Sequence, residues 1–207
     1  MNNIIIGVVS REEKINGNIY NVISKNNFKY LKDKCSYIGI MDMDNDILSI
    51  CDGVIIPGGD NIYDYHFRIL DYCIDNNVPV LGICMGCQII GLYSFSGKEG
   101  DLIKVDNHYK REHYIDIDKN SFLYNVLGYR IKVNSRHKWA LPSDKIKYKV
   151  GAKCDNIVES IEYIDNDYFL LGIEWHPEDM DNMGNLYNYF LREVLKRKCD
   201  KDKKYCN

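Results

Sequence analysis

The sequence has little proline, little tryptophan and no long apolar run. It contains 4 Pro and 2 Trp in 207 residues, and no stretch of about 18 apolar residues that would predict a membrane-spanning helix. Residues 1–10 are too short and lack the basic leader of a signal peptide. The net charge is −3 without a large basic patch, so nucleic acid is not an expected partner. We expect a cytoplasmic protein with no membrane partner.

Disulfide bonds are also not expected, although the chain has 8 cysteines. Their spacing is irregular and no secretion signal precedes them, which favours reduced thiols. With 45% hydrophobic residues, the chain can build one sizeable core. No repeat or linker interrupts it. We therefore expect a single domain over residues 1–198 and a charged, frayed tail at 199–207.

The first half alternates apolar runs with helical patterns. Continuous apolar runs predict buried strands, and spaced apolar residues predict helices. This alternation indicates βαβ units with a parallel sheet, whose ligands lie beyond the carboxyl ends of the strands. The expected strands are 4–9, 36–41, 53–56 and 78–83, and the expected helices are 18–31, 44–50 and 65–76.

The second half is richer in strands. Alternating or apolar segments predict strands at 114–118, 129–133, 146–150, 157–164 and 168–174. The segment 165–167 is typical of a hairpin turn, and residues 185–198 predict a terminal amphipathic helix.

The segment Gly82-Ile83-Cys84-Met85-Gly86 joins an apolar strand to a helical pattern. Two glycines flanking a cysteine are typical of a nucleophile held on a sharp strand–helix turn. The helix N-terminus would favour the thiolate of Cys84. Two alternatives stay open: a buried structural cysteine, and a Cys84-x-x-Cys87 redox pair.

A thiol nucleophile needs a base, and His176 is the candidate. Glu178, two residues further on, can hold the second imidazole nitrogen and fix the tautomer. The alternative is a surface histidine beside a carboxylate at a helix N-terminus.

An acyl-transfer intermediate needs donors for its oxyanion. The backbone N–H of Met85 directly follows the nucleophile, and Gly58 or Gly59 can bring a second N–H close to substrate. An ordinary turn at these glycines is the alternative.

Four motifs occur in order: Pro57-Gly58-Gly59-Asp60, Gly82 to Gln88, Val133-Asn134-Ser135-Arg136-His137, and Trp175-His176-Pro177-Glu178. Together they resemble the class I glutamine amidotransferase superfamily, and their order is most similar to its γ-glutamyl hydrolase branch. The resemblance implies an α/β three-layer sandwich with a mostly parallel central sheet, a nucleophile elbow and a small β-rich extension. It also implies a Cys-His-Glu triad that attacks a γ-glutamyl amide.

The resemblance further implies substrate contacts. Gln88 would be a substrate ligand, with simple helix packing as the alternative. Asn134 and Ser135 would hold the glutamyl head group largely through backbone, and His137 would either contact substrate or support the site. No cofactor and no metal are expected, because His108 and His113 match no strong ligand spacing.

The predicted function is a thiol hydrolase that releases glutamate and an amine from a small γ-glutamyl substrate. The alternative is a glutaminase subunit that delivers ammonia to a partner synthase, and a binding protein with the same fold is a third possibility. Met85 stands where the γ-glutamyl-GABA hydrolases typically carry Arg, so the leaving amine stays open.

Overall fold

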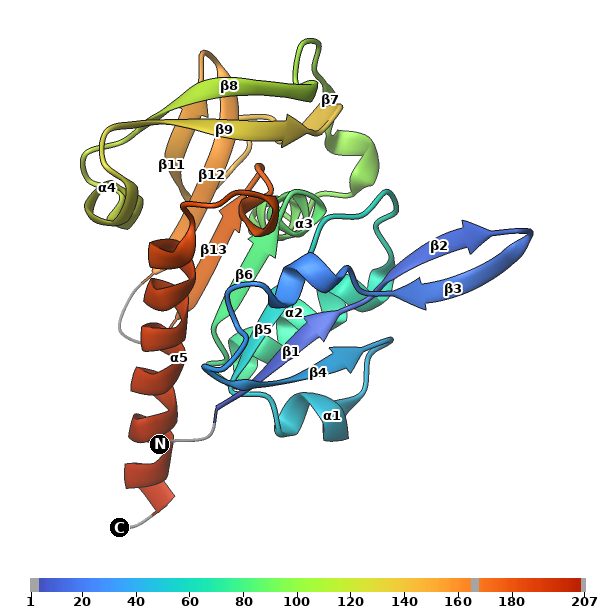
Figure 1. The fold of residues 1–207 in the computed structure, drawn as a ribbon, viewed down its shortest axis with the longest axis vertical. Helices are drawn as coiled ribbons and strands as arrows, with labels where there is room; N and C mark the ends of the chain where they lie inside the picture. The colour runs from blue at the N-terminus through green and yellow to red at the C-terminus, as the bar shows by residue number, and fades with distance from the viewer. Residues whose placement is uncertain (1–3, 165–167, 206–207) are drawn as a thin grey trace.

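A nine-stranded sheet forms the centre of the computed structural model, which describes residues 4–164 and 168–205. Figure 1 shows the sheet order β4-β1-β5-β6-β13-β12-β11-β8-β9. Strands β4 to β13 in this order are parallel, and the pairs from β13 to β9 are antiparallel. The bounds are β1 (Ile5–Val9), β4 (Ser36–Ile40), β5 (Gly53–Ile56), β6 (Val80–Ile83), β8 (Tyr109–Ile117), β9 (Arg130–Arg136), β11 (Lys149–Cys154), β12 (Ile157–Ile164) and β13 (Phe169–Ile173).

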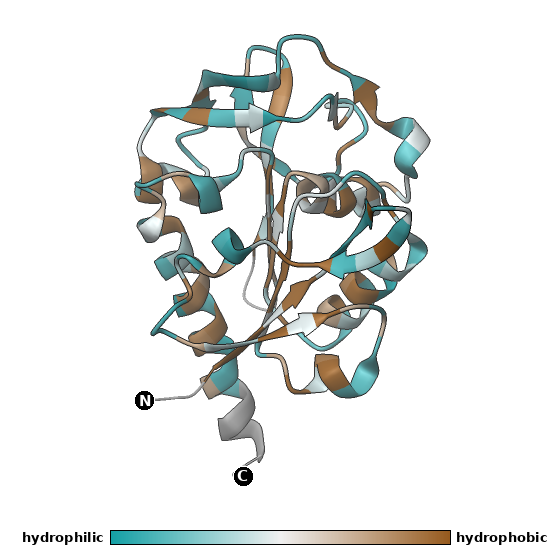
Figure 2. Cartoon of the chain, turned by 45° about the vertical axis from the view of Figure 1, so that its right-hand side comes forward, coloured by the Kyte–Doolittle hydropathy of each residue, from teal (hydrophilic) through white to brown (hydrophobic). Residues whose placement is uncertain are grey.

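Helices cover both faces of the sheet. On one face, α4 (Phe122–Leu127) and α5 (Gly184–Tyr205) pack their apolar side chains on one core cluster. On the other face, α1 (Asn45–Ser49), α2 (Asp64–Asp75) and α3 (Met85–Ser94) enclose a second cluster. Figure 2 shows the inner parallel strands as mostly hydrophobic, as two-sided burial requires. The predicted three-layer sandwich with a parallel centre and a β-rich extension is confirmed.

The predicted helix at 18–31 is wrong. Residues Asn18–Val22 form β3, which pairs antiparallel with β2 (Arg11–Ile15), and a short 3-10 helix follows at Lys25–Phe28. The two-residue turn Asn16-Gly17 has φ values of 51° and 86°. An Asn-Gly pair favours this hairpin turn, because both residues tolerate positive φ. Local turn chemistry therefore decides this segment against a weak helical pattern.

Other elements differ from expectation in extent. The predicted strand at 146–150 lies later, in β11, and the small antiparallel sheet of β7 (Ile103–Lys104) with β10 (Trp139–Ala140) has no counterpart among the expected strands. The predicted turn at 165–167 lies outside the described residues. Helix α5 continues to Tyr205, so the expected frayed tail is helical that far.

Over residues 4–164 and 168–205, no helix combines the length and the apolar character needed to span a bilayer.

Candidate active site

Cys84 sits on a strained turn between β6 and α3. Its φ of 52° and ψ of −104° lie where residues with a side chain are rarely found. A Cβ on Gly82 would lie 2.5 Å from the Gly86 carbonyl group, and a Cβ on Gly86 would lie 2.0 Å from Ile56 O. Both glycines are therefore required by the close approach of strand and helix. The predicted nucleophile elbow is present in this geometry.

The Cys84 side chain borders a cavity of about 680 Å³. Burial raises the pKa of the Cys84 thiol well above its ordinary value, and Glu174 acts in the same direction. The Met85 N–H works against this shift. The predicted preference for thiolate is therefore opposed by the surroundings, and the resting thiol is protonated near neutral pH.

His176 and Glu178 form a buried pair beside this turn. His176 Nδ1 lies 2.8 Å from Glu178 Oε1, and both residues are less than 10% exposed. The short 3-10 helix Pro177–Asp179 directly follows His176 and carries the glutamate back to the imidazole. A Cβ on Gly58 would lie 2.7 Å from His176 Cε1 and 3.4 Å from the Cys84 Cβ. The His176 ring and the Cys84 Cβ therefore both lie next to Gly58.

Asn134 fixes the backbone of this histidine. Its Nδ2 donates to His176 O at 2.9 Å, and its Oδ1 accepts from His176 N–H at 2.8 Å. With both amide atoms engaged, the side chain holds the loop rather than facing the cavity. Sequence reasoning placed Asn134 among the substrate ligands and did not anticipate this contact across 42 residues.

The candidate oxyanion donors surround the same turn. Met85 begins α3, and a Cβ on Gly59 would lie 2.9 Å from Met85 Sδ. Gly59 and Met85 both line the cavity, whereas Gly58 packs under the His176 ring. The backbone of this segment can therefore approach a bound substrate closely.

Gln88 and His137 also line the cavity, whereas the Ser135 side chain does not. Gln88 Nε2 donates to Trp139 O at 3.0 Å and to Glu174 Oε2 at 3.2 Å. Its amide oxygen is the atom left to contact a ligand. Ser135 is 1% exposed, and its hydroxyl donates to the carbonyl of His108.

Glu174 lies under the cavity and is fully buried. Burial raises its pKa to about 8, although His137 works against the shift. Burial alone would lower the pKa of His137, but Glu174 and Glu159 raise it to about 9. The protonation states of Glu174 and His137, next to the cavity, therefore depend on each other.

Several charged and aromatic lining residues were not among the predicted site residues. They come from loops and strand ends that only the fold brings together. These additional lining residues are Asp60, Glu99, Tyr109, Arg136, Lys138 and Trp139.

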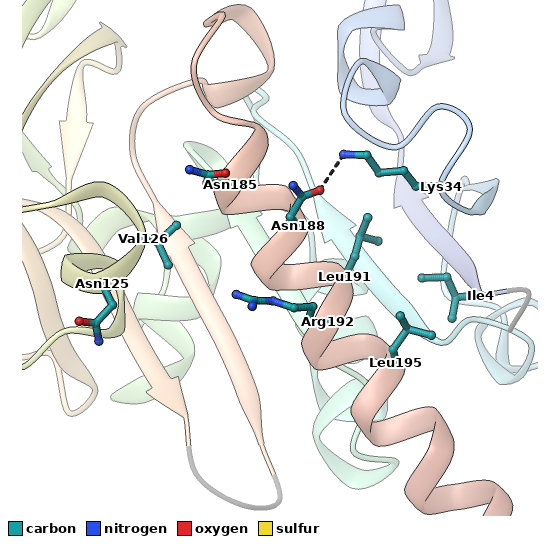
Figure 3. Close-up of a pocket in the computed structure, with 9 residues that line it drawn as sticks. All are labelled: Ile4, Lys34, Asn125, Val126, Asn185, Asn188, Leu191, Arg192 and Leu195. Carbon is teal, nitrogen blue, oxygen red and sulfur yellow. Dashed lines mark hydrogen bonds between the residues drawn. The ribbon is translucent and has the colours of Figure 1, made fainter. Parts of the chain in front are cut away.

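A second cavity, of about 580 Å³, lies along α5 (Figure 3). Lys34 Nζ donates to Asn188 Oδ1 at 2.7 Å across it. The described residues that line it include no Cys, His, Asp or Glu: Ile4, Lys34, Asn125, Val126, Asn185, Asn188, Leu191, Arg192 and Leu195. This lining offers neither a nucleophile nor a base, so the cavity at Cys84 is the candidate active site.

Comparison with known proteins agrees with this architecture. The chain belongs to the peptidase C26 family, whose model matches residues 5–178. It has the class I glutamine amidotransferase-like fold. A crystal structure of a candidate GMP synthase subunit from Thermoplasma acidophilum superimposes with a TM-score of 0.75 at 20% identity, covering 98% of this chain and 99% of that one.

Curated relatives are more distant in sequence. A glutamine-hydrolysing GMP synthase subunit of Methanobrevibacter smithii is 29% identical over 155 residues, covering 72% of this chain and 76% of that protein. The γ-glutamyl-CDP-amidate hydrolase of Campylobacter jejuni is 26% identical over 125 residues, covering 59% and 54%. The chain spans from 46% to 76% of the length of eight curated relatives that it matches. These likenesses support a glutamine amidotransferase-like hydrolase or amidase.

Proposed function

We propose that this protein is a thiol hydrolase that cleaves a γ-glutamyl amide and releases glutamate and an amine. The observation that carries the proposal is that the Cys84 Cβ and the His176 ring both lie next to Gly58. Glu178 holds the other side of that ring. Cys84 lines the cavity, and the buried His176–Glu178 pair lies beside Cys84, so a candidate nucleophile, base and orienting carboxylate lie close together.

The buried thiol starts protonated, so the first step moves its proton to His176. Because Nδ1 is engaged by Glu178, Nε2 receives the proton while the Cys84 sulfur attacks the amide carbon. The C–N bond breaks as His176 returns the proton to the leaving nitrogen. Water, deprotonated by His176, then attacks the γ-glutamyl thioester, and the sulfur leaves with a proton.

The oxyanion of each tetrahedral intermediate carries a full charge that must be stabilised. In this proposal the backbone N–H of Met85 and one N–H from Gly58 or Gly59 donate to it. Donors already fixed in a buried site need no reorganisation during the reaction, and losing one typically costs about 10²–10³ in rate.

The cavity lining suits a zwitterionic amino-acid head group. Arg136 and Lys138 supply positive charge for an α-carboxylate, and Asp60 and Glu99 supply negative charge for an α-ammonium group. The amide oxygen of Gln88 adds an acceptor. We add these side chains to the predicted contacts of Asn134 and Ser135, whose side-chain polar atoms are engaged elsewhere and which would therefore reach substrate through backbone, as predicted.

The alternative is a glutaminase subunit that feeds a partner synthase. Its support is the similarity to the GMP synthase subunit of M. smithii. The hydrolase is favoured because Glu99 and Gly100, between α3 and β8, and Tyr109, the first residue of β8, already border the cavity. These residues can contact the leaving amine without help from a second protein.

The test is coupled glutamate detection with purified chain, using a panel of γ-glutamyl amines and glutamine. We expect glutamate release from at least one conjugate, faster than from glutamine and independent of added cell extract. The blank is Cys84→Ala. No glutamate release from any conjugate, with glutamine cleavage that appears only after extract is added, would favour the synthase subunit instead.

A further inference from the structure

Three histidine rings surround one buried carboxylate beneath the candidate active site. Glu159 Oε1 lies 3.0 Å from His113 Nε2, 3.4 Å from His108 Nε2 and 3.5 Å from His137 Nε2. The side chains of Glu159 and His137 are 1% exposed. Sequence spacing did not anticipate this group, which we call the His₃Glu cluster (His108, His113, His137 and Glu159).

Four separate segments supply the cluster. His108 precedes β8, His113 lies within β8, His137 directly follows β9, and Glu159 lies in β12. Strands β8 and β9 pair directly, while β11 lies between β8 and β12 in the sheet. The cluster therefore links strands that do not all hydrogen-bond to one another.

In His108 and His137 the contact made by Nδ1 determines what the Nε2 atom, which faces Glu159, can offer. His108 Nδ1 lies 3.1 Å from Asp106 O, and His137 Nδ1 lies 3.0 Å from Trp139 O. A carbonyl oxygen only accepts, so each Nδ1 carries a hydrogen and donates it. Each Nε2 then presents either a lone pair or a second proton to the carboxylate.

The atoms at the centre of the cluster, namely the Glu159 oxygens and the three Nε2 atoms, are buried without a hydrogen bond of normal geometry. Among the residues that the structure describes, neither Glu159 oxygen has a hydrogen-bond partner, and neither does Nε2 of His108, His113 or His137. Leaving such atoms buried and unpaired is costly. A neutral Nε2 lone pair facing the carboxylate at these distances is repelled, so either protons or a metal cation must lie among these atoms.

We propose that the His₃Glu cluster binds one divalent transition-metal ion, Zn²⁺ by preference, through the three Nε2 atoms and the Glu159 carboxylate. Ligands about 2.0–2.1 Å from a tetrahedral Zn²⁺ lie about 3.3 Å from one another, and the three contacts to Glu159 match that separation. The ligand atoms of His108, His137 and Glu159 all lie within 4.8 Å of one another. His113 lies outside that mutually close set, but its Nε2 is 3.0 Å from Glu159 Oε1, so a small shift of its ring would make it the fourth ligand.

The chemistry of the surrounding atoms fits a metal centre. Imidazole and carboxylate are ligands that Zn²⁺ accepts, and metal-bound histidines typically donate their other N–H to a carbonyl or carboxylate. His108 and His137 already do so. Four protein ligands close the coordination sphere, which is typical of a structural ion rather than a catalytic one.

The ion would also support the candidate active site. His137 lines the cavity, and the Trp139 carbonyl that accepts from His137 also accepts from Gln88. Fixing the His137 ring therefore fixes one wall of the cavity. The proposal does not depend on which amide the protein cleaves.

Metal content of the untagged, full-length protein is the first measurement. After expression with added ZnCl₂, we expect about one Zn²⁺ per chain by elemental analysis. Removal by a chelator should lower the unfolding temperature, and ZnCl₂ should restore it. Less than about 0.1 equivalent bound, with no thermal shift on adding ZnCl₂, would overturn the proposal and leave a proton-sharing His–Glu cluster.

The ligand set is tested by spectroscopy and substitution. Replacement by Co²⁺ should give the visible bands of a four-coordinate site, and X-ray absorption should show nitrogen and oxygen ligands alone. Cys154 has a sulfur near His108 and His113, so a sulfur ligand would overturn this ligand set.

Matched variants locate the site. Glu159→Gln and His108→Gln should each weaken Zn²⁺ binding at least about tenfold, whereas His66→Gln, at a buried histidine outside the cluster, should leave it unchanged. Equal affinity in all three would overturn the assignment. If a cluster variant does not fold, the ligand count from X-ray absorption on the wild-type protein still decides the question. Every readout is independent of activity, so an inactive protein that binds Zn²⁺ leaves this inference intact.

Discussion

The parallel and antiparallel halves of the sheet bury different chemistry. Strands β5, β6 and β13 bury every residue, and all of those residues are apolar or glycine. Strand β12 buries Glu159, Ser160 and Glu162 with its apolar residues. One half is thus stabilised by apolar burial, and the other buries polar and charged groups that need partners.

Each buried carboxylate of the antiparallel half faces partners from distant segments. Glu162 accepts from Ser121 Oγ at 2.8 Å and pairs with Lys149 Nζ at 2.7 Å. Glu159 faces the histidines of the His₃Glu cluster. Such groups specify one arrangement of strands, because any slip in register would leave a buried charge unpaired.

The candidate catalytic groups lie where the two halves meet. Cys84 ends the parallel strand β6, and His176 follows β13, whose other neighbour is the antiparallel β12. Asn134, from β9, holds the His176 backbone. The parallel half therefore carries the proposed nucleophile, and a residue of the antiparallel half holds the backbone of the proposed base.

The largest expected effect comes from removing the proposed nucleophile, which lies in the parallel half. Cys84→Ala should lower the turnover rate by at least about 10⁴-fold, because a nucleophile is not replaceable by its neighbours. Stability should be nearly unchanged. Cys84→Gly should be more stable than Cys84→Ala by about 1 kcal/mol, since glycine relieves the positive φ. Activity assays and urea unfolding measure both, and residual turnover in Cys84→Ala would assign the nucleophile elsewhere.

The next effect comes from the antiparallel half. Asn134→Ala should lower kcat by about 10–100-fold with little change in KM, because a small displacement of the base is costly. Ser135→Ala, whose hydroxyl binds the His108 carbonyl, is the neighbouring control and should lower kcat less. Steady-state kinetics decide: a raised KM with normal kcat would return Asn134 to the role of substrate ligand.

Sequence alone predicts the parallel half well. Its strands are continuous apolar runs, and Gly82, Cys84 and Gly86 lie close together in the chain. The residues that form this turn are neighbours in the chain, so the sequence pattern alone is enough to predict it. The same holds for His176 and Glu178, which are two residues apart.

The antiparallel half is harder because its polar contacts are long-range. Nothing near Asn134 in the sequence indicates a bond to His176, and nothing near Glu159 indicates three histidines 22 to 51 residues upstream. Half-buried strands also give weaker patterns, which is why the strand expected at 146–150 starts later in the structure. The missed hairpin at Asn16-Gly17 is different, because its local turn pattern is present in the sequence.

A smaller effect concerns His66, a buried histidine of α2, and the cost of protonating it inside the core. His66 is 1% exposed, its Nδ1 accepts from Tyr63 N–H at 3.0 Å, and burial lowers its pKa to about 4. As pH falls from 7 to 5, the unfolded state takes up a proton near pH 6.5 and the folded state does not. This histidine should therefore cost up to about 2 kcal/mol of stability over that range.

His66→Gln should remove that part of the pH dependence, because glutamine keeps an acceptor but does not titrate. Urea unfolding of both proteins at pH 7 and pH 5 gives the difference, and the His₃Glu cluster is common to both. An identical pH dependence in the two proteins would show that His66 is not the titrating group.

The smallest effect concerns the β2–β3 hairpin, which projects beyond the sheet in Figure 1. Gly17 has φ +86° and no atom within 4 Å of an added Cβ, so conformation alone penalises a side chain there. Gly17→Ala should destabilise the hairpin by about 1 kcal/mol. Gly100→Ala is the matched control, since Gly100 has equal space without a positive φ.

Because the hairpin can open without the sheet, hydrogen exchange at residues 11–22 of Gly17→Ala should accelerate while β5 and β6 stay protected. Faster exchange in β5 and β6 as well would mean that the hairpin and the parallel half unfold as one unit.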